Sequence, residues 1–175
     1  PKTPKPQNPK TPLQSFFKHM DSEIQLVLPE FYPWVMFVSV LLAFQCYLIG
    51  FVVVLRVWSR VFNKEFMDKN FKEIHSWTFG EDPPALGFPD TGNGFYSKKL
   101  SYKDWYAFNN AQRVHWNFLE HLPITITLVL VCGLFYPEVA TGLGGLYFVA
   151  WLLYTIFYQI SPNKRVAGAL LGNIT

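Results

Sequence analysis

The feature that most restricts the fold of this sequence is one long apolar run. The 22 residues from Trp34 to Leu55 contain no charged side chain, and Arg56 and Arg60 follow directly. At a rise of about 1.5 Å per residue, a helix of this length crosses the roughly 30 Å hydrocarbon core of a bilayer. The run is too long for the core of a signal peptide and begins after 33 more polar residues. It therefore predicts a membrane-spanning helix over residues 34–55.

Composition supports a membrane location and excludes several classes of protein. Of the 175 residues, 50% are hydrophobic and 15% are charged, whereas about a quarter are charged in soluble domains. The net charge of +3 is spread over the polar segments and forms no dense basic stripe for nucleic acid. Two cysteines and four scattered histidines lack the spacing of a metal site. We expect membrane lipid as a partner, and neither nucleic acid nor a metal.

Two further spans and the start of a fourth helix follow from the same criteria. Residues 139–160 form a second charge-free run with polar residues at both ends. The apolar run over residues 122–136 is too short to span alone, so its helix is expected to begin near Phe108. A fourth helix is expected from about Val166, and the sequence stops before that helix crosses. The prediction is an all-α integral membrane protein, an antiparallel four-helix transmembrane bundle with the fourth helix truncated or incomplete in this chain, with spans at about 34–55, 108–136 and 139–160.

The chain is expected to divide into a tail and a transmembrane helical domain. Residues 1–33 begin rich in proline and lysine and form a polar segment before the membrane, and residues 34–175 form the domain. Within it, residues 56–107 are expected to be a long polar loop, and such a loop usually has a function or an interface. Because successive spans alternate in direction, this loop and the exit of the third span share one side. Their lysines and arginines place that side toward cytosol or matrix.

A polar stripe runs along the expected second span. Four side chains, spaced at i, i+4, i+7 and i+8, share one face of that helix: Arg113, Asn117, Glu120 and His121. Ionisable groups at membrane depth are costly unless they are paired or line a cavity, so the stripe is a candidate site. Two plainer interpretations stay open. In one, the Arg113 side chain extends to the lipid headgroups, and in the other, Glu120 and His121 form a satisfied polar contact between helices.

The expected third span carries tyrosines on one face, at i, i+7 and i+11: Tyr147, Tyr154 and Tyr158. An aromatic belt at the membrane surface would explain them equally well. Three arginines are expected near the same membrane edge: Arg56, Arg113 and Arg165. Together these groups suit a ligand with two carboxylates and an amine, because a guanidinium binds a carboxylate through two hydrogen bonds. The sequence has no nucleophile triad or phosphate loop, so a reaction would take its nucleophile from a substrate.

The segment 108–123 carries the most specific motif. Its R-x-x-x-N-x-x-E core begins at Arg113, and a proline stands three residues after the glutamate. This segment closely resembles the signature of the membrane-associated eicosanoid and glutathione metabolism family. The tyrosine pair of the third span, the Lys-Arg pair after it and the arginine that closes the first span agree with that family in order and spacing. Within the family, His115 and residues 133–144 are most similar to the microsomal glutathione S-transferase 3 branch.

The resemblance implies a left-handed four-helix bundle that assembles as a homotrimer and binds glutathione, as a co-substrate without a metal, between subunits. Arg165 would stabilise the thiolate, which would attack a lipophilic electrophile or lipid hydroperoxide from the bilayer. His121 stands where leukotriene-synthesising relatives have tyrosine, and it keeps a hydrogen-bond donor. The neighbouring subunit would add Arg56 and His115 to the glutathione site. The other glutathione-binding residues would come from one subunit: Arg113, Asn117, Glu120, His121, Tyr154 and Tyr158.

Three functions are compatible with the sequence. The first is a glutathione-dependent transferase or peroxidase in an endoplasmic-reticulum-type or mitochondrial membrane. The second is a non-catalytic accessory subunit of a larger membrane complex, for instance a mitochondrial one, for which the 56–107 loop and the tail offer docking surface. The third is a lipid-presenting scaffold, which would not bind glutathione.

Overall fold

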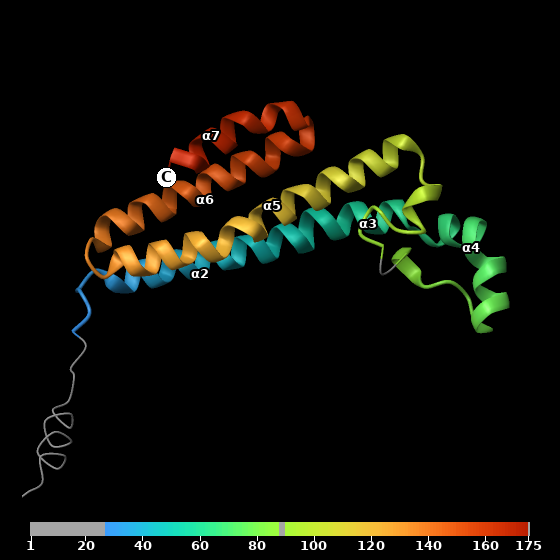
Figure 1. Cartoon of the computed structure of the whole chain (residues 1–175), viewed down its shortest axis with the longest axis horizontal. Helices are drawn as coiled ribbons and strands as arrows, with labels where there is room; N and C mark the ends of the chain where they lie inside the picture. The colour runs from blue at the N-terminus through green and yellow to red at the C-terminus, as the bar shows by residue number, and fades with distance from the viewer. Residues whose placement is uncertain (1–26, 88–89, 175) are drawn as a thin grey trace, which may run out of the picture.

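The computed structural model describes residues 27–87 and 90–174, and most of the expected tail, residues 1–26, lies outside this part. The described residues contain helices and no strand. Three helical segments are long and apolar enough to cross a membrane: Tyr32–Val61, Tyr102–Gly133 and Pro137–Ile160. Figure 1 shows these segments lying side by side along the long axis of the molecule. The prediction of an all-α transmembrane bundle is confirmed.

The first span consists of α2 (Tyr32–Leu48), the π-helix η1 (Ile49–Val54) and α3 (Leu55–Val61). A proline in the first turn of α2 suits a helix start, because its missing N–H would have no partner there. The helix continues past the charge-free run, since charged side chains are readily solvated where it leaves the hydrocarbon. The π-helix was not predicted, because its wider turn leaves no signature in the hydrophobic pattern.

The second and third spans are α5 (Tyr102–Gly133) and α6 (Pro137–Ile160). The helix α5 begins six residues before the expected start, because Ser101 caps it. The Ser101 Oγ accepts a hydrogen bond from the Asp104 N–H at 3.1 Å and donates one to the Asp104 carboxylate at 2.7 Å. A short turn then reverses the chain into α6, which starts at Pro137. Both spans therefore exist, with boundaries shifted by a few residues.

The last described elements turn the chain back along the bundle. The 3₁₀ helix η4 (Pro162–Arg165) leads into α7 (Val166–Ile174), which packs on α6 (Figure 1). A Cβ atom at Gly168 would lie 2.5 Å from the Tyr154 backbone nitrogen, so only glycine allows this approach. The fourth helix starts where the sequence predicts it.

The connection over residues 56–107, expected as a polar loop, is largely structured. It contains the end of α3, α4 (Lys64–Phe79), two short 3₁₀ helices, η2 (Ala85–Gly87) and η3 (Ser97–Lys99), and the first turns of α5. We call residues 62–101 the head. Its core is a buried cluster that includes Phe62, Met67, Phe71 and Phe108 of α5. The expectation failed because the apolar residues that form this core are few and are separated by charged ones.

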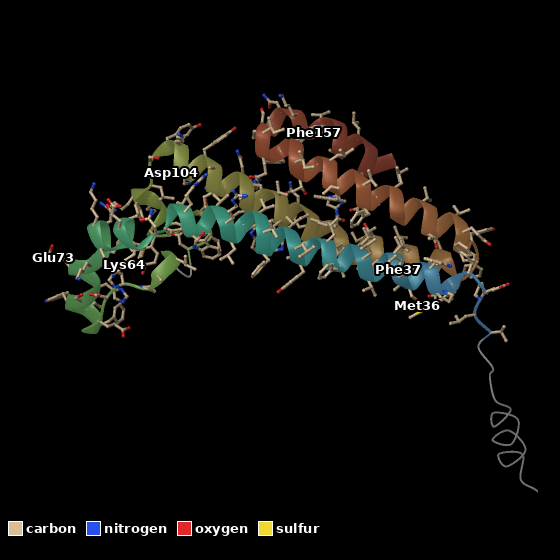
Figure 2. All side chains as sticks on the ribbon, turned by 180° about the vertical axis from the view of Figure 1, so that it is seen from behind. Met36, Phe37, Lys64, Glu73, Asp104 and Phe157 are labelled. Atoms are coloured by element: carbon tan, nitrogen blue, oxygen red, sulfur yellow. The ribbon has the colours of Figure 1, made fainter. Side chains whose placement is uncertain are left out.

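Charged and apolar side chains are distributed along the long axis. Figure 2 shows Lys64, Glu73 and Asp104 at the end that carries the head, and Met36 and Phe37 toward the other end. Met36 and Phe37 are exposed, as expected for side chains that face lipid. The head therefore projects from the membrane on the side where the first span ends and α5 begins.

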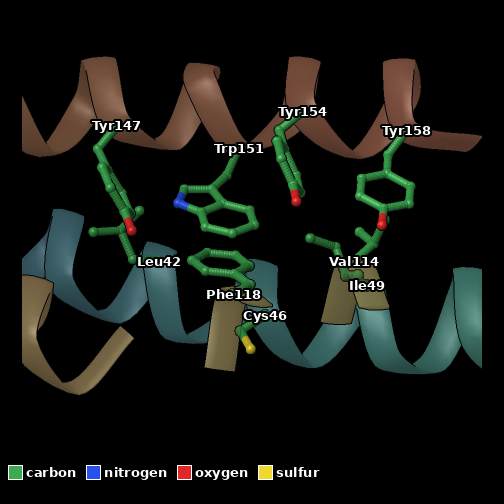
Figure 3. Packing of buried hydrophobic residues seen from close by; sticks show 9 residues of the cluster. All are labelled: Leu42, Cys46, Ile49, Val114, Phe118, Tyr147, Trp151, Tyr154 and Tyr158. Carbon is green, nitrogen blue, oxygen red and sulfur yellow. The ribbon is translucent and has the colours of Figure 1, made fainter. Parts of the chain in front are cut away.

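The centre of the bundle is an aromatic column on α6. Figure 3 shows its rings directed from α6 toward α2 and α5: Tyr147, Trp151, Tyr154 and Tyr158. The Trp151 ring stacks on Phe118 of α5 with centroids 4.5 Å apart. The three tyrosines are only 6%, 6% and 5% exposed, so the aromatic-belt interpretation is wrong for them. They face the interior of the bundle.

Candidate functional site

The core of the candidate site is a hydrogen bond between two spans. The Asn117 Nδ2 on α5 donates to the Tyr154 Oη on α6 at 2.7 Å. Both residues belong to the predicted set, and 37 positions separate them in the sequence. The bond orients the amide and fixes the phenol. Each group keeps further hydrogen-bonding capacity, because the amide has a second N–H and a carbonyl oxygen.

A cation contacts Tyr158, which lies one turn beyond Tyr154 on α6. The Arg165 Nη1 donates to the Tyr158 Oη at 3.3 Å, and the guanidinium carbon lies 5.3 Å from the centroid of the same ring. Arg165 ends η4, and its side chain is exposed apart from these contacts. Ring and hydroxyl together hold the positive charge at the end of the bundle. An anion that approaches the Tyr154 and Tyr158 hydroxyls would therefore meet this charge.

A small cavity lies beneath these groups, between α5, α6 and α7. Its volume is about 120 Å³, and its polar lining residues include Asn117, His121, Tyr147 and Tyr154. A water molecule occupies about 30 Å³ in the liquid, so the cavity holds a few waters and is too small for a tripeptide. A larger ligand must bind against the outer face of this subunit.

The charged members of the predicted stripe lie on that outer face. Arg113, Glu120 and His121 are exposed, and among the described residues Arg113 and Glu120 form no ion pair. Within the described part of one chain Glu120 therefore has no ionic partner, and a satisfied contact of Glu120 and His121 between helices would need a helix of another subunit. Seven residues, or about 10 Å along the axis, separate Arg113 from Glu120, which places the carboxylate deeper in the span.

Neither Arg56 nor His115 lines the cavity beside Asn117 and Tyr154. Arg56 is exposed on α3, and His115 faces the first span, where its ring packs against Gly50. Because positions 115 and 117 lie about 200° apart around a helix, they belong to different faces of α5. The structure thus divides the predicted residues into a Tyr154 side and a first-span side.

Sequence reasoning missed several residues of this region. Trp151 lines the cavity and holds Phe118 in place, yet it reads only as an apolar residue in a span. Gly168 and Gly172 also line the cavity, and their small-residue spacing was the available signal. Within residues 27–87 and 90–174 there is no group of three side chains suited to a metal ion.

A comparison with known families identifies the class of protein. The profile of the membrane-associated eicosanoid and glutathione metabolism (MAPEG) family matches residues 34–175. The chain therefore belongs to the MAPEG family and is an integral membrane protein. Members of this family are typically membrane trimers that act on glutathione and lipophilic substrates. No solved structure matches the chain.

Proposed function

We propose that the chain is a glutathione-dependent membrane transferase or peroxidase of the microsomal glutathione S-transferase 3 type. The observation that carries the proposal is the joined arrangement of Asn117 with Tyr154 and of Arg165 with Tyr158 at one end of the bundle. Each pair gives the hydroxyl of a buried tyrosine a polar partner from another element. Both present polar groups toward the face where Arg113 and Glu120 are exposed.

The chemistry of glutathione matches these groups. The tripeptide has two carboxylates, one ammonium, two amides and a thiol. Arg113 can bind a carboxylate and Glu120 the ammonium, since a charge-assisted hydrogen bond is about twice as strong as a neutral one. The Asn117 amide and the Tyr154 hydroxyl can bind the peptide groups. Arg165 can then contact the sulfur atom of the thiol.

A second copy of the chain would complete the site. Glu120 is exposed at membrane depth, where an unpaired carboxylate is costly, so a polar ligand or a neighbour must cover it. Arg56 and His115 face away from it within one subunit, and in a homotrimer each subunit can present them to the next. Such an interface joins two different surfaces, as a ring of three requires.

In the proposed reaction the thiol of glutathione loses its proton to water, and Arg165 stabilises the thiolate. Each unit by which the thiol pKa falls corresponds to about 1.4 kcal/mol. With an epoxide, a bond forms between sulfur and carbon, the carbon–oxygen bond breaks, and the alkoxide takes a proton. With a hydroperoxide, sulfur attacks the terminal oxygen and releases the lipid alcohol. A second glutathione then converts the sulfenic acid to glutathione disulfide and water.

Glutathione consumption by the purified chain in lipid nanodiscs tests this proposal, with a fatty-acid epoxide and a fatty-acid hydroperoxide as co-substrates. We expect turnover that falls about tenfold or more in Asn117→Ala, because an interaction with the bound tripeptide is lost. Asn110→Ala, on the same helix two turns away, should keep the wild-type rate. Equal rates in all three proteins, or none above the protein-free rate, would refute the proposal.

An accessory subunit of a larger complex, for instance in a mitochondrial membrane, is the second candidate, and the surface of the head favours it. Trp77 is 85% exposed and lines a groove of about 470 Å³ together with Ile74 and Phe95, and Phe79, at the end of the same helix, is 68% exposed. Exposed apolar patches of this kind mark interaction sites. After mild solubilisation of native membranes, this candidate predicts a native mass well above that of a trimer, reduced in Trp77→Ser. A trimer mass in both proteins would contradict it.

A further inference from the structure

A second, larger cavity lies on the first-span side of α5. This cleft has a volume of about 480 Å³. Its walls are mainly apolar and include Phe51, Val54 and Trp116. Its polar lining groups include Thr91, Gln112 and His115, together with the ring substituents of Tyr47 and Trp58. Apolar walls with a few polar groups are typical of sites that bind small molecules.

The π-helix η1 shapes one wall of the cleft. A Cβ atom at Gly50 would lie 3.0 Å from the His115 Nε2, so a larger residue there would displace the imidazole. The glycine lets the ring lie against the helix at the edge of the cleft. Because π-helices are rare and frequently occur at functional sites, this wall is a candidate for more than packing.

The long axis of the cleft runs along the membrane normal. On α5 the lining runs from Gln112 to Leu119, about 10 Å along the helix, and on the first span from Trp58 inward to Tyr47. Trp58 and Gln112 lie at the end of the bundle from which the head projects. The end of the cleft that carries Thr91 and Gln112, which we call its polar end, is therefore at the membrane edge, and the rest of the cleft extends into the hydrocarbon.

A segment of the head covers the polar end. The carboxylate of Asp90 is 5% exposed and accepts three backbone hydrogen bonds, from Gly92 at 2.8 Å, Gly94 at 3.1 Å and Ser97 at 2.7 Å. These bonds fix residues 90–97 in one conformation. Thr91 is exposed, lines the cleft and stands between Asp90 and Gly92 in this hydrogen-bonded segment.

The same segment is attached to the walls of the cleft. The Gly92 carbonyl accepts hydrogen bonds from the Trp105 Nε1 at 3.0 Å and the Asn109 Nδ2 at 3.3 Å, both on α5. The Trp58 Nε1, on the opposite wall, donates to the Leu86 carbonyl of η2, and the Asp90 N–H joins the segment to η2 by donating to the Gly87 carbonyl at 3.0 Å. These bonds join the cover to both walls of the cleft, and the fold therefore fixes the position of Thr91.

We propose that Thr91 is a specificity-determining residue for the lipophilic electrophile. It lines the outer end of the cleft and, with Gln112, binds a hydroxyl or carbonyl group at the head of an electrophile whose unbranched apolar chain lies between the first span and α5. Asp90 is a positioning residue that acts through Thr91. The inference rests on the proposed function, because the electrophile is the one that glutathione attacks.

The first test is binding and needs no activity. The chain in nanodiscs is labelled with a fatty acid that carries a diazirine in its chain, and the labelled peptides are identified by mass spectrometry. We expect labelling in residues 47–58 and 112–119, reduced at least about fivefold in Thr91→Trp, which fills the cleft, and unchanged in Thr91→Ser. Equal labelling of the three proteins would refute the role of Thr91.

The second test is selectivity between 4-hydroxy-2-nonenal and 2-nonenal, which differ by one hydroxyl group. Thr91→Val keeps the shape of threonine and should lower the ratio of the two kcat/KM values about fivefold, the effect of one hydrogen bond. Asp90→Ala should lower the ratio equally, and an unchanged ratio in Thr91→Val would refute the inference. If labelling depends on Thr91 but the chain consumes no glutathione, the proposed function is refuted and the cleft remains a site for amphiphiles.

Discussion

At the scale of single residues, the bundle fixes some groups of the candidate site and leaves others free. Tyr154 and Tyr158 are buried and hydrogen-bonded, whereas Arg113 and Glu120 are exposed. Fixed dipoles that need no rearrangement are what an electrostatic catalyst requires, and the free charges can adapt to a ligand. Under the proposed function, this division assigns orientation of the substrate to the tyrosine face and recognition of its charged ends to the stripe on α5.

Arg165 tests this assignment. Arg165→Ala removes the cation beside Tyr158 but leaves the Asn117–Tyr154 bond. We expect conjugation to be lost while the Kd for glutathione changes by less than about tenfold, because one contact of several is removed. Calorimetric binding and turnover on the same preparation measure both quantities. Lys164→Ala is the control, and an equal loss of binding and turnover in Arg165→Ala would show that Arg165 serves binding alone.

Asp90 offers a residue-scale prediction for stability. Asp90→Ala removes an acceptor of three backbone hydrogen bonds, each worth about 1.5–3 kcal/mol because the acceptor is charged. Amide hydrogen exchange over residues 92–97 should accelerate at least about tenfold, while exchange in the middle of α6 is unchanged. Asn93→Ala, within the same segment, should leave exchange as in the wild type. Unchanged exchange in Asp90→Ala would mean that the cage does not hold the segment.

At the scale of elements, the close packing of α7 on α6 depends on one glycine. Gly168→Ala would place a Cβ 2.5 Å from the Tyr154 backbone, so α7 must move away. We expect the apparent Tm to fall by roughly 3–10 °C, a cost typical of overpacking. Gly145→Ala, within α6 and with nothing within 4 Å of the added methyl, should be neutral or slightly stabilising. A similar Tm for both variants would contradict the close approach.

The sequence predicted elements whose signal is a long uniform pattern. The runs at 34–55 and 139–160 predicted spans because length and absence of charge suffice, and the tyrosine face of α6 followed from helical spacing. The helix α4 and the cage around Asp90 could not be predicted. Their stability comes from a few contacts distant in sequence, such as Phe71 with Tyr96 at 4.7 Å between ring centroids. The candidate residues were recognised through a motif, whereas the element that each face of α5 meets, the first span at His115 and α6 at Asn117, required the structure.

At the scale of the whole molecule, the two faces of α5 make the assembly testable. If each site combines the Tyr154 side of one subunit with Arg56 of the next, Arg165→Ala and Arg56→Ala subunits are defective in different halves. Co-expression of these two inactive variants should restore about a quarter of the wild-type activity, because random mixing in a ring gives that share of intact sites. Separately expressed variants, mixed after purification, are the control. No recovery on co-expression would place both residues in one subunit's site.

The most direct measurement is the ultraviolet absorbance of the glutathione thiolate, recorded as glutathione is added to the wild-type chain in detergent and as the pH is raised. The proposed site predicts saturable binding and a thiol pKa below that of free glutathione, so that thiolate absorbance appears at lower pH in the complex. No binding at millimolar glutathione, or binding with the thiol pKa of free glutathione, would contradict a transferase site in this protein.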